Sequence, residues 1–190
     1  MPNPSLPGPR ERLLDAVDEL LNLASIHGTG VDAIVRRSGT ARKSLYLYFQ
    51  SKDELFTAVL QRRSERWIAW FESSTLAQST VASEQLLGMF DVLRKWLRGD
   101  GFYGCALLNA AAEVKDTCRD IKLVTLMHNK RLLEFLERLC AASGASDAHS
   151  LARQLLILLD GAITLSMVEG TATAAVDAKE AARAMLAGTA

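Results

Sequence analysis

The most informative absence in this 190-residue sequence is proline, because all four prolines lie within the first nine residues. Helix interiors exclude proline, whereas folds rich in strands usually place it in their many loops. A chain without proline after residue 9 therefore favours helices joined by short turns. Residues 1–9 themselves, rich in proline and glycine, are predicted to form a disordered arm.

Long apolar runs and paired cysteines are also missing. The most apolar stretch, from Leu155 to Leu165, is interrupted by Asp160 and is too short to span a membrane. The chain does not begin with a basic segment followed by an apolar core, the pattern of a signal peptide. Its three cysteines are odd in number and lack metal-ligand spacing, so we expect reduced thiols and no metal site. These absences favour a cytoplasmic protein with no membrane partner.

The net charge is zero, which at first argues against a nucleic-acid partner, but the charge is unevenly distributed. Residues 1–66 contain ten Lys or Arg and eight Asp or Glu, whereas residues 67–190 contain twelve and fourteen. Five basic residues fall between positions 36 and 52, namely Arg36, Arg37, Arg42, Lys43 and Lys52. A basic cluster is by itself more often a solvated surface than a binding site.

The apolar spacing predicts an all-α fold of about nine helices. The first helix starts at Pro9, and two short helices over residues 31–37 and 41–47 flank a turn in which Gly39 adopts a positive φ. Ser51 and Glu54, three residues apart, form a capping box that opens a long helix. Further helices are expected over 82–98, 104–114, 117–142 and 147–169, and a last helix capped by Asp177 and Glu180 ends at Gly188.

The two short helices around Gly39 have the organisation of a helix-turn-helix. Arg42 and Lys43 fall in the first turn of the second helix, where each cation costs about 0.3–1 kcal/mol against the helix dipole. A phosphate backbone at that position reverses the sign of this interaction, which favours DNA as the partner. Tyr46 and Tyr48 are two residues apart, so at least one of them is expected to point outward.

Several short motifs occur in order along this region. They are Val31-Asp32-Ala33-Ile34, Gly39, Leu45-Tyr46-Leu47-Tyr48-Phe49, Gln50-Ser51-Lys52 and Asp53-Glu54-Leu55-Phe56. With this spacing, about residues 10–60 resemble the TetR/AcrR family of bacterial transcriptional regulators. The tract from Gly104 to Glu113 more weakly resembles a C-terminal region of one group of these regulators. The resemblance implies a helix-turn-helix DNA-binding domain over 10–54 and a helical ligand-binding and dimerisation domain over 55–190.

The resemblance also implies roles for individual residues. Thr40, Arg42, Lys43, Ser44 and Tyr46 would face DNA from the recognition helix, and Thr29, Tyr48 and Lys52 would contact phosphates. The sequence departs from the family pattern at three positions. Gly30 replaces the usual hydroxyl residue that caps the helix over 31–37, Leu47 replaces the usual His, and Lys43 stands where Gly is frequent.

For the C-terminal domain, the resemblance implies a small-molecule pocket and a dimer interface. The candidates for the pocket are Trp67, Trp70, Phe71, Phe90, Trp96, Phe102, Asn109, Glu113, His128, Asp160 and Thr164. Aromatic residues at this spacing are more often core than ligand contacts. The candidates for the interface are Leu158, Gly161, Ala162 and Leu165, because a glycine inside a helix costs about 1 kcal/mol and indicates a close helix approach.

Other function classes find less support in the sequence. The segment from Gly99 to Gly104 matches G-x-G-x-x-G, but it follows a helical rather than a strand pattern, so a dinucleotide site is rejected. We find no catalytic motif and predict neither an enzyme nor a cofactor. The expected protein is a homodimeric repressor that binds a palindromic double-stranded DNA operator and responds to a small-molecule effector. The alternative is a helical adaptor or small-molecule binder without DNA activity.

Overall fold

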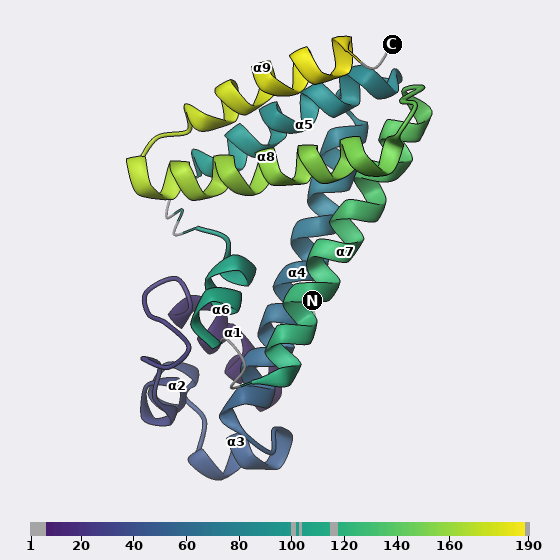
Figure 1. Ribbon diagram of the computed structural model, residues 1–190. Helices are drawn as coiled ribbons and strands as arrows, with labels where there is room; N and C mark the ends of the chain where they lie inside the picture. Colours follow the sequence, from purple (N-terminus) through teal and green to yellow (C-terminus); the bar gives the residue numbers. More distant parts are fainter. Residues whose placement is uncertain (1–6, 100–101, 103, 115–117, 189–190) are drawn as a thin grey trace, which may run out of the picture. The chain divides into compact units, whose positions relative to one another are not determined.

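The computed structural model describes residues 7–99, 102, 104–114 and 118–188 (Figure 1). These residues form helices and turns without a strand, so the predicted all-α fold is confirmed. The helices in chain order are α1 (Pro9–Leu20), α2 (Val31–Ser38), α3 (Arg42–Tyr48), α4 (Lys52–Leu76), α5 (Ala82–Leu97), α6 (Ala106–Val114), α7 (Arg119–Ala142), α8 (Ala148–Glu169) and α9 (Ala174–Ala187). Residues 1–6 of the predicted arm lie outside the described residues.

Local signals in the sequence placed most helix ends within two residues. Pro9 is the first residue of α1, and Gly39 follows α2 with a φ of 60°. The Ser51 hydroxyl accepts a hydrogen bond from the Glu54 N–H at 3.1 Å, as a capping box requires. The Glu54 carboxylate, however, accepts from the Gln50 N–H at 2.6 Å, one residue before the position that the motif predicts.

The expected start of the last helix is wrong. α9 begins at Ala174, three residues before Asp177, with Thr173 at its N-cap and no side-chain cap hydrogen bond. Asp177 lies in the first turn, where its charge favours the helix dipole without capping the end. The acidic pair therefore marked the first turns of the helix and not its boundary.

The chain divides into two compact units, each of which combines distant segments. The first contains residues 1–64 and 106–125, and the second contains residues 65–105 and 126–190. This division differs from the expected boundary between residues 54 and 55. It falls inside α4 and α7, and it assigns α6 to the same unit as the helix-turn-helix.

In the first unit, α1, α2 and α3 pack against one another around a small apolar core. Leu13, Val17, Ile34, Leu45 and Phe56 are fully buried, and such burial contributes about 1.5–3 kcal/mol per side chain. Ion pairs join α1 to its neighbours, since Glu19 pairs with Arg37 of α2, and Asp15 and Asp18 pair with Arg62 and Arg63 of α4.

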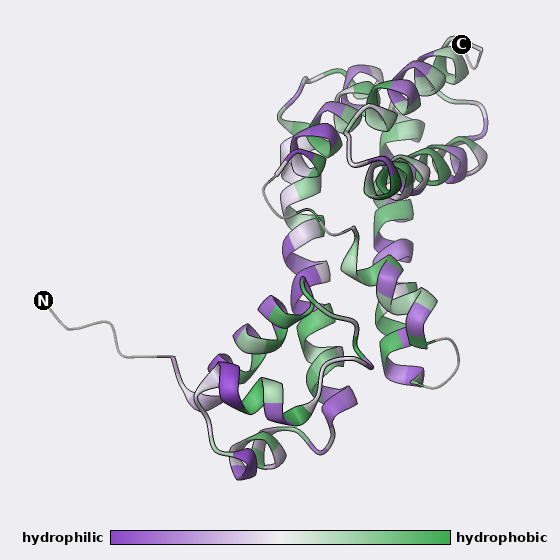
Figure 2. Ribbon diagram, turned by 90° about the vertical axis from the view of Figure 1, so that its left-hand side faces the viewer, coloured by the Kyte–Doolittle hydropathy of each residue, from purple (hydrophilic) through white to green (hydrophobic). Residues whose placement is uncertain are grey.

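In the second unit, α9 packs against both α8 and α5 (Figure 1). Individual helices carry both hydrophobic and hydrophilic residues, the pattern of amphipathic helices (Figure 2). α8 buries Leu151, Leu155 and Leu159, whereas Ile157, Leu165 and Val168 on the same helix are exposed. Among the described helices, α8 reaches the length and mean hydropathy of a membrane span, but the core helix of a folded domain shares these properties.

Candidate functional site

The recognition helix α3 of the predicted helix-turn-helix contributes one buried side chain to the core. Leu45 of α3 is fully buried, and it fixes which side of this short helix faces the core. Arg42 and Lys43 occupy the first two positions of α3, whose N-terminus has no side-chain cap, and both side chains are exposed. Arg42 lies 3.4 Å from Asp32, but both partners are exposed, and such a pair contributes little to stability.

Tyrosine hydroxyls and one leucine extend this exposed surface. Tyr46 and Tyr48 are 51% and 39% exposed, so the prediction that at least one tyrosine points outward is confirmed. Leu47 between them is 75% exposed, although it is apolar. α3 thus presents basic, aromatic and apolar side chains to the outside, and only Leu45 among its residues is buried.

Two groups of basic residues in the first unit differ in whether they have an acidic partner. Arg37, Arg62 and Arg63 are neutralised by carboxylates of α1. Arg36 of α2 and Lys43 of α3 are exposed and have no acidic partner among the described residues. Arg36 was outside the predicted contact set, although it belongs to the basic cluster that the sequence revealed.

Two threonines predicted to face DNA are instead buried in turns. Thr29 is 2% exposed, and its hydroxyl donates to the Ser25 carbonyl at 2.8 Å. Thr40 is 9% exposed, and its hydroxyl lies 2.7 Å from the Ser38 hydroxyl. Both side chains therefore stabilise the turns that precede α2 and α3.

Lys52 also differs from its expected environment. Its ammonium donates to the carbonyl of Ile26 at 2.9 Å and to that of Thr29 at 3.2 Å, and it lies 5.5 Å from the Phe56 ring centroid. These contacts hold the loop between α1 and α2 against the start of α4. Lys52 is thus a structural cation in this conformation.

Glu113, a candidate for the ligand pocket, also contacts the loop between α1 and α2. Its carboxylate accepts the N–H of Ile26 at 2.9 Å and that of His27 at 2.5 Å, and it lies 2.7 Å from the His27 Nδ1. Burial opposes ionisation here, but the hydrogen bonds from His27 and Ile26 outweigh it and hold the pKa of Glu113 below its usual range. Asn109, on the same helix α6, is exposed.

Most of the aromatic candidates meet in the second unit as one packed cluster. The Trp67 ring stacks on Phe71 at 4.8 Å and meets Trp96 edge-on at 5.6 Å, and Trp96 meets Phe102 at 5.0 Å. His128 lies 5.6 Å from Trp67, and Trp70 lies 6.2 Å from it. Phe90 is separately buried in α5.

The polar candidates in this unit have different environments. Burial, with a smaller effect from the charge of Arg131, lowers the pKa of His128 to about 4. Burial raises the pKa of Asp160 on α8 to about 6. Thr164, one turn further along α8, is exposed, and its hydroxyl donates to the Asp160 carbonyl at 2.9 Å.

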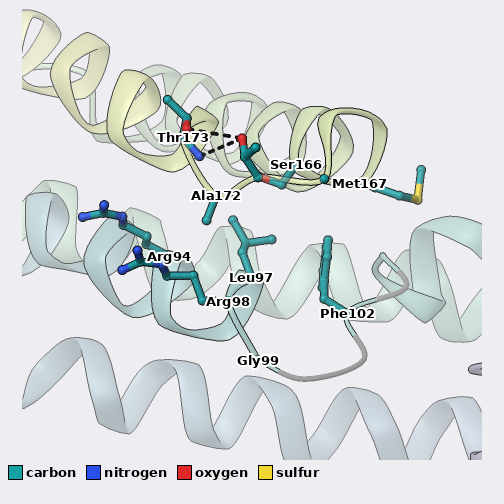
Figure 3. Close-up of a pocket in the computed structure, with 11 residues that line it drawn as sticks. Arg94, Leu97, Arg98, Gly99, Phe102, Ser166, Met167, Ala172 and Thr173 are labelled. Carbon is teal, nitrogen blue, oxygen red and sulfur yellow. Dashed lines mark hydrogen bonds between the residues drawn. The ribbon is translucent and has the colours of Figure 1, made fainter.

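A cavity of about 560 Å³ lies in the second unit, between the end of α5, the end of α8 and the turn before α9 (Figure 3). Of the predicted pocket residues, only Phe102 lines it. Its lining residues come from two segments, 94–99 together with Phe102 and 166–173, which are far apart in the sequence and show no shared motif. Sequence periodicity therefore had no signal that pointed to this cavity.

The interface candidates on α8 lie on one side of the helix by their spacing but differ in exposure. Ala162 is 3% exposed and packs inside the unit, whereas Leu165 is 50% exposed and Gly161 is also exposed. Leu158 is half-buried. A Cβ atom at Gly161 would have nothing within 4 Å, so the described part of this chain gives no packing reason for a glycine there.

Comparisons with known proteins find similarity to bacterial transcriptional regulators. The model of the family described as "Bacterial regulatory proteins, tetR family" matches residues 13–59. Over 159 residues, the chain is 20% identical to the HTH-type transcriptional regulator YjdC of Escherichia coli (strain K12), covering 84% of this chain and 83% of that protein. Over 60 residues, it is 38% identical to the HTH-type transcriptional activator FasR of Mycolicibacterium smegmatis, covering 32% and 27% of the two chains.

Solved structures extend the similarity beyond the N-terminal region. A TetR-family transcriptional regulator from Streptomyces coelicolor superposes with a TM-score of 0.87 at 26% identity, and the match covers 95% of each chain. Escherichia coli NemR in its reduced form gives a TM-score of 0.81 at 18% identity, covering 92% of this chain and 95% of that one. The second similarity concerns the fold alone.

Proposed function

This chain belongs to the TetR family of bacterial regulatory proteins, and from that membership we propose that it is a ligand-responsive repressor. As a DNA-binding transcriptional regulator of this family, it is not an enzyme. The proposal is that a cytoplasmic homodimer binds a palindromic operator and is released by a small molecule.

The observation that supports this proposal best is the exposed surface of α3. In a helix-turn-helix the second helix enters the major groove, and the residues near its start reach the base edges. Arg42 and Lys43 occupy that position, and Arg can donate two hydrogen bonds to guanine. Arg36 precedes this basic pair in the sequence and Tyr48 follows it. Both side chains are exposed, and we assign them to phosphate contacts.

The exposed apolar face of α8 supports the homodimer. Ile157, Gly161 and Leu165 follow one another at four-residue intervals and therefore lie on one side of this helix. Ile157 is 67% exposed and Val168 is 74% exposed, more than a helix of a stable monomer usually leaves to water. We propose that α8 and α9 pack against their copies. A palindromic operator with half-sites one helical turn apart would require the two recognition helices to lie about 34–36 Å apart.

Control by a ligand is supported by how α6 is held. Glu113, near the end of α6, binds the loop before α2, and Phe102 lines the cavity four residues before α6 begins at Ala106. A ligand that contacts Phe102 would therefore bind four residues from the start of α6, the helix whose Glu113 holds that loop. By linkage, a ligand that releases the operator must bind the DNA-free protein more tightly than the DNA complex.

The test of DNA binding uses the purified full-length chain and labelled DNA from upstream of its own gene. Fluorescence anisotropy should detect specific binding that weakens with salt, because each neutralised phosphate adds about −0.9 to the slope of log K against log salt. The absence of salt-dependent binding would refute the proposal for that DNA. Transcription of neighbouring genes in a deletion strain then gives the sign of regulation, since one relative is named an activator. A repressor predicts an increase.

A further inference from the structure

The cavity at the end of α5 has the size of a small-molecule site. Its volume of about 560 Å³ falls within the range of about 300–1,000 Å³ that is typical of ligand pockets. Every residue that lines it belongs to the second unit, and the view in Figure 3 shows the end of α5 on one side and the turn between α8 and α9 on the other.

One wall of the cavity carries positive charge without a balancing carboxylate. Arg94 lies in the last turn of α5, and Arg98 is the C-cap four residues later, so both lie on the same side of the end of this helix (Figure 3). Both are exposed, neither has an acidic partner in the described part of the chain, and no Asp or Glu is among the described lining residues. Two adjacent guanidinium groups repel each other, and an oxyanion between them would remove this repulsion.

A buried hydroxyl on the opposite wall lacks a hydrogen-bond partner. Ser166 of α8 is only 3% exposed and lines the cavity, yet its Oγ makes no hydrogen bond with any described residue. Buried hydroxyls are nearly always satisfied, and an unsatisfied one needs an explanation. An oxygen atom of a ligand in the cavity would supply the missing partner.

The turn before α9 adds further groups that favour an anion. Gly170 ends α8 with a φ of 69°, and the chain then passes Thr171 and Thr173 on the cavity wall. The Thr173 N–H donates to the Thr171 hydroxyl at 3.4 Å, while no side chain caps the N-terminus of α9 (Figure 3). The N-terminus of this 14-residue helix carries partial positive charge.

Apolar side chains line the remaining part of the cavity. Leu97, Phe102 and Met167 are among its lining residues, and Phe102 packs edge-on against Trp96 at 5.0 Å. An inorganic ion would leave this apolar surface uncovered. The lining therefore suits a molecule with a charged oxyanion at one end and an apolar body at the other.

We propose that this cavity binds a small organic anion, a carboxylate or a phosphate ester with an apolar chain. Arg94 and Arg98 would bind the oxyanion, Ser166 would hydrogen-bond to it, and Leu97, Phe102 and Met167 would cover the apolar part. The proposal of an anion site does not depend on the proposal of DNA binding. Its role as the effector site, in contrast, rests on the proposed function.

Calorimetric titration of the full-length chain with matched probes tests the ligand class. Octanoate and octyl phosphate provide the two oxyanions, and 1-octanol provides the same apolar chain without charge. We expect one or both anions to bind at least tenfold more tightly than the alcohol, because charge-assisted hydrogen bonds are the strong ones. Equal affinity for octanol and the two anions, or no binding of either anion, would overturn the proposal.

Substitutions in the lining then test the assigned residues. Arg94→Gln and Arg98→Gln should each weaken anion binding about tenfold or more, and Ser166→Ala should weaken it several-fold. Lys95→Gln is the matched control, because it removes the same charge from the same helix outside the cavity. Arg94→Lys keeps the charge and should retain part of the affinity. A loss for Lys95→Gln as large as that for Arg94→Gln would refute the site.

Measuring operator affinity in the presence of these anions distinguishes the proposed anion site from the proposed function. If octanoate or octyl phosphate binds and also lowers operator affinity, both the site and its effector role are supported. Anion binding that leaves operator affinity unchanged supports the site and refutes its effector role. Anion binding by a chain that fails to bind DNA supports the site and overturns the proposed function.

Discussion

At the scale of single residues, Arg42 and Lys43 are the side chains on which operator discrimination should depend. Each is exposed at the start of α3, and a good side-chain contact to the correct base contributes about 1–3 kcal/mol of discrimination. We predict that Arg42→Ala or Lys43→Ala reduces the affinity ratio between operator and unrelated DNA about tenfold or more, measured by anisotropy at fixed salt. Arg37→Ala is the control, because Arg37 pairs with Glu19, and its ratio should stay unchanged. An unaltered ratio in both α3 variants would contradict the assignment of α3 as the base-reading helix.

His128 should make stability depend on pH in a specific direction. The unfolded His binds a proton near pH 6.5, whereas the buried ring in the native state does so only near pH 4. Between these values the unfolded state holds more protons, so the free energy of unfolding falls as pH decreases. The loss approaches about 3 kcal/mol at pH 4, since one pKa unit corresponds to about 1.36 kcal/mol.

Chemical denaturation of the wild type and His128→Gln from pH 7 to pH 4 measures this effect. Asp160 acts in the opposite direction, because its raised pKa makes stability increase as pH falls from about 6 towards 3.8. That contribution is common to both proteins and cancels in their difference. The wild type should therefore lose more stability on acidification than the variant. Parallel pH profiles would show that protonation of His128 does not destabilise the fold.

At the scale of elements, the loop between α1 and α2 depends on both α4 and α6. Lys52 donates to its carbonyls and Glu113 accepts from its N–H groups, so the loop is held by charges of both signs. Hydrogen bonds to charged groups contribute about 1.5–3 kcal/mol each. This loop leads directly into α2, and its position fixes where the helix-turn-helix begins.

The salt dependence of operator binding distinguishes a structural role of Lys52 from a phosphate contact by its ammonium group. We predict that Lys52→Met lowers the free energy of unfolding by about 1–3 kcal/mol and weakens operator binding, while the slope of log K against log salt stays the same. Arg36→Ala should do the reverse, with unchanged stability and a slope about 0.9 smaller in magnitude. A smaller slope for Lys52→Met would mean that its ammonium leaves the loop to bind DNA.

The elements that sequence predicted well are those whose signals are local. Gly39, the basic pair at the start of α3 and the capping residue Ser51 each act within a few positions, and all of them occupy the expected places. The contacts of Lys52 and Glu113 could not be predicted locally, because their partners are separated from them by 23 to 87 residues. The burial of Thr29 could not be predicted for a different reason, since its partner Ser25 is near but its burial comes from tertiary packing.

At the scale of the whole molecule, ion pairs reduce the basic charge that the first unit can present to DNA. The acids of α1 neutralise Arg37, Arg62 and Arg63, so these basic residues stabilise the first unit and are not free for DNA. Exposed cations without an acidic partner, such as Arg36 and Lys43, are few among the described residues of this unit. Non-specific affinity should therefore be modest, and the operator should be distinguished mainly through contacts of α3.

Binding to the proposed palindromic operator would require a second copy of the chain. A face of α8 that leaves Ile157 and Leu165 largely exposed is unfavourable in water and is stabilised when it packs on an identical face. We predict that the wild type has twice the 20.7 kDa mass of one chain in light scattering and that Ile157→Glu or Leu165→Glu shifts it to the mass of one chain.

Leu23→Glu is the control for the dimer, because Leu23 is 75% exposed in the first unit and outside the proposed interface. Its mass should equal that of the wild type. The monomeric α8 variants should keep their helical circular dichroism but lose most of their affinity for a two-site operator, while their weak affinity for a single half-site stays unchanged. A monomeric wild type would exclude the dimer. Variants of α8 that remain dimeric would exclude this face as the contact, because a buried unpaired glutamate strongly destabilises an apolar interface.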